Sequence, residues 1–233
     1  MVQQQAALLK PESLVAEFKK NGVTHIVTIP DSETNYLYEL MKDQDWLEVV
    51  PSSREGETFA IALGLIVDLL VGDMDSVSQE TLAVCNTVAQ HPVDKEATDL
   101  ELALAAAVDT GASAVTIVTS AGGRFDHALA NLLVAASDRW SALKVDLVVD
   151  RARVHVVRDK VVLEGRVGEP VSLLAVGQPV SGVSTTGLRW PLSGARLEAG
   201  LGLGVSNEFA QSEASVTVGT GVVLVIVPSP EQP

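Results

Sequence analysis

A change in the secondary-structure pattern near Lys144 constrains the fold of this 233-residue chain more than any other feature. Before it, strand-like β-branched runs such as 65–71 and 114–118 alternate with helical patterns over 78–89, 98–109 and 126–137. Such alternation predicts a Rossmann-like, mostly parallel sheet flanked by helices. After it, short β-rich segments separated by Gly and Pro predict an all-β sandwich or barrel. The expected fold is therefore α/β, with an α/β domain over residues 1–142 and a β-rich domain over 143–233.

Three acidic clusters lie in the α/β half of the chain. They occupy residues 72–76, 94–99 and 122–127, and two of them directly follow predicted strands. Ligands of open α/β sheets bind at the carboxyl ends of the strands. Mg²⁺ is held by one or two carboxylates together with substrate phosphates. The clusters together indicate a metal-assisted phosphoryl or pyrophosphoryl site.

Each cluster taken alone also has an ordinary structural explanation. Asp73 and Asp75 point to opposite faces of an extended chain, so a turn is needed to bring them together. Their ordinary explanation is a solvated acidic loop with an Asx-turn. Thr98 or Asp99 can simply cap a helix. The Gly-Gly-Arg run at 122–124 offers N–H groups and a guanidinium to an anion, but Gly-Gly pairs are also common in turns.

Charge and composition argue against several classes of protein. A net charge of −14 without any basic run argues against a nucleic-acid partner. There is no P-loop motif, and four scattered histidines without metal spacing argue against zinc. The single cysteine, Cys85, rules out an intramolecular disulfide and fits a reducing compartment. The sequence shows no secretory signal and no apolar run long enough to span a membrane, so the expected location is the cytoplasm.

The order of these motifs, continued by residues 186–192 and 204–208, resembles that of thiamine pyrophosphokinases over about residues 65–227. This family transfers a pyrophosphoryl group from ATP to the hydroxyl of thiamine, giving thiamine diphosphate and AMP. The resemblance implies a transferase of thiamine diphosphate biosynthesis that uses Mg²⁺ and takes ATP as co-substrate. It also implies a homodimer whose thiamine sites lie between the subunits.

The motif match further implies roles for individual residues. The carboxylates implied in catalysis are Asp73, Asp75, Asp99 and Asp126, of which the first three would hold Mg²⁺. The residues implied at the ATP phosphates are Asp94, Gly123, Arg124 and His127. Those implied at thiamine are Trp190, Ser206 and Asn207. Without the match, Trp190 reads as a core aromatic and Ser206-Asn207 as a turn.

The N-terminal segment, about residues 18–65, resembles a different family. Its runs at 19–25, 29–35 and 53–62 are similar to the pyrimidine-binding domain of thiamine-diphosphate-dependent sulfopyruvate and phosphonopyruvate decarboxylases. In that family the residue matching Glu55 touches the aminopyrimidine. Arg54 stands where pyrophosphokinases carry the Asp of an Asp-Gly-Gly-Ala turn. The α/β domain is therefore expected to join a decarboxylase-like part, 1–64, to a pyrophosphokinase-like part, 65–142, as a natural fusion or an engineered chimera.

Three functions are compatible with this sequence. The first is an active thiamine pyrophosphokinase. The second is a chimera or scaffold that binds thiamine or nucleotide without turnover, because the N-terminal Asp-Gly-Gly element is missing. The third is a decarboxylase fragment that binds thiamine diphosphate around Glu55. The first is favoured, because the motifs after residue 65 are intact.

Overall fold

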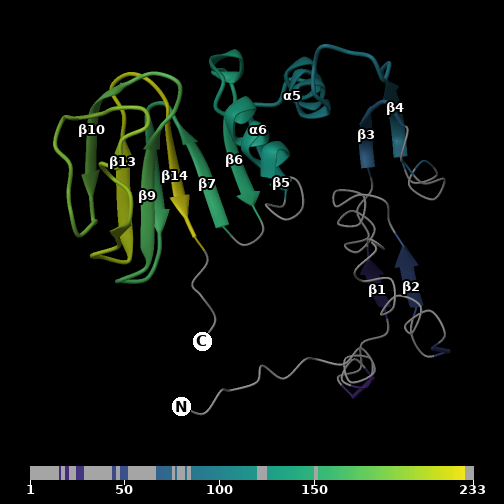
Figure 1. Ribbon diagram of the computed structural model, residues 1–233, viewed down its shortest axis with the longest axis horizontal. Coiled ribbons are helices and arrows are strands. Elements are labelled where there is room, and N and C mark those ends of the chain that lie inside the picture. Colours follow the sequence, from purple (N-terminus) through teal and green to yellow (C-terminus); the bar gives the residue numbers. More distant parts are fainter. Residues whose placement is uncertain are drawn as a thin grey trace, which may run out of the picture. The chain divides into compact units, whose positions relative to one another are not determined.

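Figure 1 shows the computed structural model of the chain. It describes residues 16, 19–20, 25–28, 44–45, 48–51, 67–74, 77, 82, 85–119, 125–149 and 152–228. The chain divides into two compact units, Met1–Lys95 and Glu96–Pro233, each of which is considered by itself.

The described strands of the first unit form two parallel pairs. Strand β1 (His25–Thr28) pairs with β2 (Glu48–Pro51), and β3 (Val67–Gly72) pairs with β4 (Cys85–Gln90). The strand predicted over 65–71 is therefore confirmed as β3. The helix predicted over 78–89 is wrong at its C-terminal end, where residues 85–90 form β4. Pairing with β3 supplies hydrogen bonds that the local pattern of this segment does not reveal.

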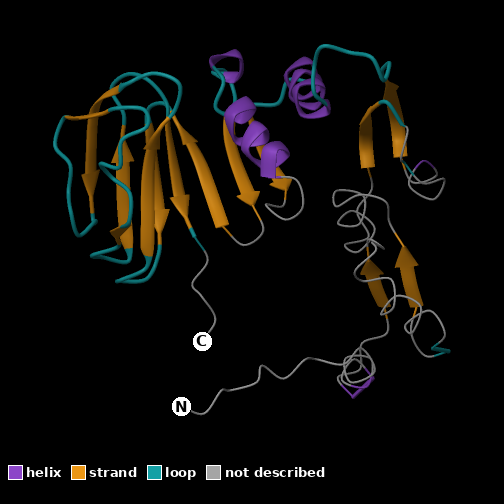
Figure 2. Cartoon of the chain, viewed as in Figure 1, coloured by secondary structure: helices purple, strands orange, loops and turns teal. Residues whose placement is uncertain are grey.

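The second unit begins with two helices that alternate with two parallel strands. Helix α5 (Asp99–Asp109) precedes β5 (Ala114–Thr119), and α6 (Phe125–Ala135) precedes the short 3₁₀ helix η1 (Asp138–Trp140) and β6 (Lys144–Val149). The predicted helices at 98–109 and 126–137 and the strand at 114–118 are thus confirmed. In the described part of this unit the helices all come before β6 in the chain, and Figure 2 shows them in purple beside a larger region of strands and loops.

Eight further strands follow in the described part of the second unit. They are β7 (Ala152–Val157), β8 (Lys160–Glu164), β9 (Pro170–Ala175), β10 (Val180–Thr186), β11 (Ala195–Leu197), β12 (Asn207–Glu208), β13 (Glu213–Thr217) and β14 (Val223–Val227). One sheet has six strands in the order β12-β9-β14-β7-β6-β5, and the other has four in the order β11-β10-β13-β8. Side chains from both sheets, including Leu173 and Val216, pack into one apolar core.

The six-stranded sheet joins parts that the sequence analysis separated. Strand β6 pairs in parallel with β5 and antiparallel with β7, so parallel and antiparallel pairing occur in a single sheet. The prediction of a mixed α/β fold is confirmed. The layout of a parallel sheet followed by a separate sandwich or barrel is not confirmed. A second core cluster holds Leu104 and Trp140 together with Val154 and Leu224. The domain boundary expected between residues 142 and 143 stays a prediction.

None of the described helices has the length and apolar character needed to cross a membrane.

Candidate active site

Asp73 lies immediately after β3, where the first acidic cluster begins. Its Oδ2 atom accepts a hydrogen bond from Nζ of Lys95 at 3.2 Å, and the two side chains are only 14% and 15% exposed. The backbone of this turn is tied to β4, because Gln90 donates to the carbonyl of Asp73 at 3.4 Å. The structure therefore holds a half-buried carboxylate at a strand end and neutralises it with a lysine.

Met74, the residue after Asp73, has an unusual backbone conformation. Its φ of 65° is in the left-handed region, which non-glycine residues rarely adopt. The extended course of β3 therefore does not continue through Met74, and the convergence of Asp73 with Asp75 stays a prediction. Asp75 itself lies outside the described residues.

The second acidic cluster leads into α5. The Thr98 hydroxyl accepts from the N–H of Glu101 at 3.2 Å, and the Glu101 carboxylate accepts from the N–H of Thr98 at 2.9 Å. This reciprocal pair is a capping box, so Thr98 is the N-cap. The pKa of Glu101 is held below its ordinary value, chiefly by the hydrogen bond from the Thr98 N–H and also by the Thr98 hydroxyl, which donates to the same carboxylate at 3.1 Å. Asp99, the first residue of α5, is half-buried, and Asp94 is exposed before the helix begins.

The third acidic cluster reaches into the first turn of α6. The side chains of Asp126 and His127 are exposed there, at the end of a helix whose N–H groups and dipole favour an anion. Farther along the helix, Asn131 donates to the Thr119 hydroxyl at 3.5 Å and so links α6 to the end of β5. Gly123 and Arg124 lie outside the described residues.

Carboxylate oxygens are the donor type that Mg²⁺ prefers, and the half-buried carboxylate of Asp73 fits this requirement. Among the residues that the structure describes, no three His, Cys, Asp or Glu side chains lie close enough together to hold a metal ion.

A pocket of about 230 Å³ surrounds Trp190, on the loop between β10 and β11. Its lining is largely apolar and includes Leu192, residues 202–205 and Asn207. Trp190 is 51% exposed, so it is not a core aromatic. Ser206 is also exposed, has a φ of 57°, and donates its N–H to the Ser172 hydroxyl at 3.0 Å. The structure thus brings two of the three predicted thiamine residues, Trp190 and Asn207, to one pocket.

Asn207 is occupied chiefly by the backbone. It is 3% exposed, and its Oδ1 accepts from the N–H groups of Trp190 at 3.1 Å and Glu208 at 2.9 Å. Its Nδ2 donates to the carbonyl of Trp190 at 2.8 Å. A side-chain amide has two acceptor sites and two protons. Among the residues that the structure describes, one amide proton of Asn207 has no partner, and its contact with thiamine stays a prediction.

Sequence reasoning did not single out Arg189 and Glu208. The guanidinium of Arg189 lies over the Trp190 ring, 4.7 Å from its centroid, and donates to Oε2 of Glu208 at 2.7 Å. Both residues lie within motifs used for the family resemblance, which is the signal that could have identified them. The ion pair between Arg189 and Glu208, however, forms only because the fold brings together two segments that are 19 residues apart in the sequence.

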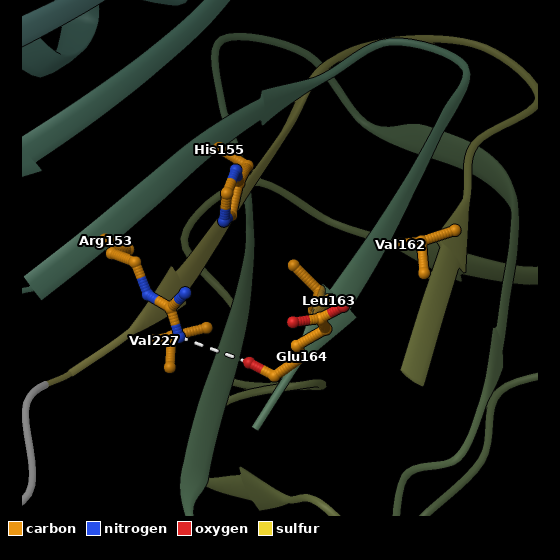
Figure 3. Close-up of a pocket in the computed structure, with 6 residues that line it drawn as sticks. All are labelled: Arg153, His155, Val162, Leu163, Glu164 and Val227. Atoms are coloured by element: carbon orange, nitrogen blue, oxygen red, sulfur yellow. Dashed lines mark hydrogen bonds between the residues drawn. The ribbon is translucent and has the colours of Figure 1, made fainter. Parts of the chain in front are cut away.

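A second pocket, of about 350 Å³, lies elsewhere in the second unit (Figure 3). Its lining residues are Arg153, His155, Val162, Leu163, Glu164 and Val227. Arg153 donates to the carbonyl of Glu164 at 3.2 Å, the hydrogen bond drawn in Figure 3. The ring of His155 is fixed by Asp146, whose Oδ1 lies 2.7 Å from Nδ1. No residue predicted to bind thiamine or ATP lines this second pocket.

Comparison with known proteins identifies similar chains. Residues 20–149 match the family model described as thiamin pyrophosphokinase, catalytic domain, and residues 154–223 match thiamin pyrophosphokinase, vitamin B1 binding domain. Thiamine pyrophosphokinase of Bacillus subtilis is 22% identical over 224 residues, covering 94% of this chain and 98% of that protein. Thiamine pyrophosphokinase 2 of Oryza sativa subsp. japonica is 31% identical over 155 residues, covering 61% of this chain and 58% of that protein.

Two solved structures have the same fold. The crystal structure of thiamine pyrophosphokinase from Bacillus subtilis superposes with a TM-score of 0.66 at 20% identity, covering 89% of this chain and 99% of that one. A thiamin pyrophosphokinase family protein from Enterococcus faecalis superposes with a TM-score of 0.65 at 24% identity, covering 80% and 90%.

These comparisons correct the expectation for the N-terminal segment. The catalytic-domain match begins at residue 20 and runs through the proposed joint without interruption. The decarboxylase-like origin of residues 18–65, and with it the fusion or chimera, is therefore not supported. Arg54 and Glu55 lie outside the described residues.

Proposed function

This chain belongs to the thiamin pyrophosphokinase family, and from that premise we propose that it transfers a pyrophosphoryl group from ATP to the hydroxyl of thiamine. The products are thiamine diphosphate and AMP. One observation carries the proposal: matches to the catalytic model and to the vitamin B1 binding model follow each other along the same chain.

The acidic residues of the first two clusters form the proposed metal site. Asp73, Asp75 and Asp99 would hold Mg²⁺, which would supply positive charge to neutralise the phosphates. The low exposure of Asp73 supports this role, because removing a carboxylate from water strengthens its attraction for a cation. Lys95 pairs with Asp73 in the structure and would give up this ion pair to a bound cation.

The start of α6 and the loop before it form the proposed phosphate site. Gly123 and Arg124, with His127 and the supporting Asp94, bind the ATP phosphates. Asp126 accepts the proton of the thiamine hydroxyl as that oxygen attacks the β-phosphorus. Two observations support these roles: Asp126 and His127 are exposed in the first turn of α6, and a helix N-terminus favours anions.

The pocket around Trp190 is the proposed thiamine site. Trp190 stacks on a ring of thiamine, and Ser206 and the remaining amide proton of Asn207 hydrogen-bond the pyrimidine. The pocket lies on the part of the chain that matches the vitamin B1 binding model, which supports this assignment.

The proposed working form is a homodimer in the cytoplasm, with the thiamine site at the subunit interface. Exposed apolar side chains beside the pocket support the interface. They are Leu201 at 64%, Leu203 at 54% and Val205 at 44% exposure. Sedimentation of the wild type is expected to give twice the chain mass, and Leu203→Glu is expected to shift it toward the monomer.

A direct assay tests the proposed reaction. AMP formation from ATP is expected only when both thiamine and Mg²⁺ are present, with thiamine diphosphate identified by mass spectrometry. Asp73→Asn is expected to lower kcat by about a hundredfold or more, because a carboxylate at the metal site is lost. Asp109→Asn, at the exposed end of α5, is the matched control. Binding of thiamine or ATP without product would favour a non-catalytic binding protein instead.

A further inference from the structure

We propose that Arg189, Glu208 and Asn207 form a clamp that positions the Trp190 ring and leaves one of its faces for the substrate. These three are positioning residues, because they act on thiamine through Trp190. The inference rests on the proposed function for its substrate, but the clamp itself is built entirely from contacts within the second unit.

The backbone half of the clamp is made by Asn207. Its side chain accepts from the N–H of Trp190 and donates to the carbonyl of the same residue, at 3.1 and 2.8 Å. Two hydrogen bonds to one residue fix that residue in both position and orientation. Because Asn207 is 3% exposed, water does not compete for these bonds. The neighbouring N–H of Arg189 also donates to the carbonyl of Glu208 at 2.9 Å, which ties the loop to β12.

The ring half of the clamp is made by Arg189 and Glu208. Arg189 stacks 4.7 Å from the centroid of the Trp190 ring. A guanidinium on an exposed side chain is otherwise free to rotate, but Oε2 of Glu208 holds Nη1 of Arg189 at 2.7 Å. Glu208 is the residue after Asn207, so one short strand, β12, anchors both the backbone and the ring of Trp190.

The clamp determines how the ring meets a ligand. An aromatic ring has two faces, and Arg189 covers one of them. Trp190 is nevertheless 51% exposed and lines the pocket, so ring surface remains for stacking. Holding the ring before the substrate arrives lowers the ordering entropy that binding would otherwise cost. The expected effect of the clamp is therefore on thiamine affinity, with no effect on the chemical step.

Kinetics of clamp variants test whether the clamp affects thiamine affinity and leaves the chemical step unchanged. Arg189→Met, which keeps an apolar stem but loses the cation, is expected to raise KM for thiamine about tenfold while leaving kcat and KM for ATP unchanged. Arg189→Lys is expected to restore part of the loss, because an ammonium keeps the charge but not the planar stacking. Asn207→Asp is expected to raise KM for thiamine further, because a carboxylate oxygen then faces the Trp190 carbonyl.

Arg196→Met is the matched control. Arg196 pairs with Glu198 at 2.6 Å and is 59% exposed, against 60% for Arg189, but it stacks on no tryptophan in the described part of the chain. It is expected to keep the wild-type KM. Three results would overturn the clamp. In Arg189→Met they are an equal rise in KM for ATP, or a fall in kcat with an unchanged KM for thiamine. The third is the same rise in KM for thiamine in Arg196→Met.

The ring itself gives a readout that does not depend on turnover. In protein labelled with 5-fluorotryptophan, Trp190→Phe identifies the ¹⁹F resonance of Trp190. Arg189→Met is expected to shift and sharpen that resonance, since the ring gains motion, whereas Arg196→Met leaves it in place. An unmoved resonance in Arg189→Met contradicts the clamp even if thiamine is turned over. A moved resonance in a protein that forms no thiamine diphosphate supports the clamp and refutes the proposed function.

Discussion

Gly187 controls how closely the loop that carries Trp190 approaches β13. Its φ is 71°, and a Cβ at this position would overlap the carbonyl oxygen of Glu213 and lie 2.9 Å from Cα of Ala214. Both obstacles are backbone atoms, which cannot move aside without breaking the pairing of β13. Gly187→Ala is therefore expected to lower the free energy of unfolding by about 3 kcal/mol or more, measured by urea denaturation.

A second glycine separates the effect of contact from that of backbone conformation. Gly194 has a φ of 58°, but a Cβ there meets nothing within 4 Å. Gly194→Ala is expected to cost only the left-handed conformation of an alanine, about 1 kcal/mol. Equal losses in the two variants would show that the close approach to β13 does not matter.

At the scale of the element, α5 depends on the capping box at its start. The side chains of Thr98 and Glu101 satisfy each other's backbone N–H groups, which have no partner inside the helix. Thr98→Ala removes one of these acceptors and is expected to destabilise the chain by about 1 kcal/mol in thermal or urea unfolding. Thr110→Ala, after the last turn, is the control, because its hydroxyl contacts only one carbonyl.

The same capping box makes a prediction about pH. The pKa of Glu101 is lowered from 4.5 in the folded chain, chiefly by the backbone hydrogen bond from Thr98. A carboxyl whose pKa is lowered by folding stabilises the chain above its unfolded pKa and loses that effect as pH falls through the folded pKa. The stability difference between wild type and Glu101→Gln is therefore expected at pH 6 and 7 and to shrink as the pH falls below 4.5. A difference that stays constant with pH would contradict the prediction.

At the scale of the whole molecule, one core cluster connects α5, α6, η1 and the six-stranded sheet. Leu104 in α5, 1% exposed, belongs to the same cluster as Val154 in β7 and Leu224 in β14. Arg158 adds a polar connection, because it donates to the carbonyls of Ala136 and Ser137 at 2.9 and 2.7 Å. The second unit thus has shared packing on both sides of residue 142.

This shared core predicts cooperative unfolding of the second unit. Leu104→Ala is expected to lower the free energy of unfolding by about 3 kcal/mol, as for other buried leucines. Hydrogen exchange is expected to show lower protection in β7 and β14 as well as in α5, because the cluster unfolds together. Val167→Ala, at a residue 71% exposed, is expected to change neither quantity. Loss of protection confined to α5 would show that the helix unfolds independently of the sheet.

Local patterns in the sequence determined much of this protein. β-branched runs predict the strands at 67–72 and 114–119. Helical periodicity and a capping residue predict the helices at 99–109 and 125–135. These signals act over a few neighbouring residues and can be read without the fold. The order of the motifs likewise identified the family that the comparisons show.

Tertiary structure alone decided the features that depend on distant segments. The β4 strand forms because β3 pairs with it. Strand β6 pairs in parallel with β5 and antiparallel with β7. The amide of Asn207 serves the backbone of Trp190, 17 residues away, and Arg189 is held over the ring by Glu208. No pattern of neighbouring residues encodes such meetings, because they arise only when the folded sheets bring separate strands and loops together.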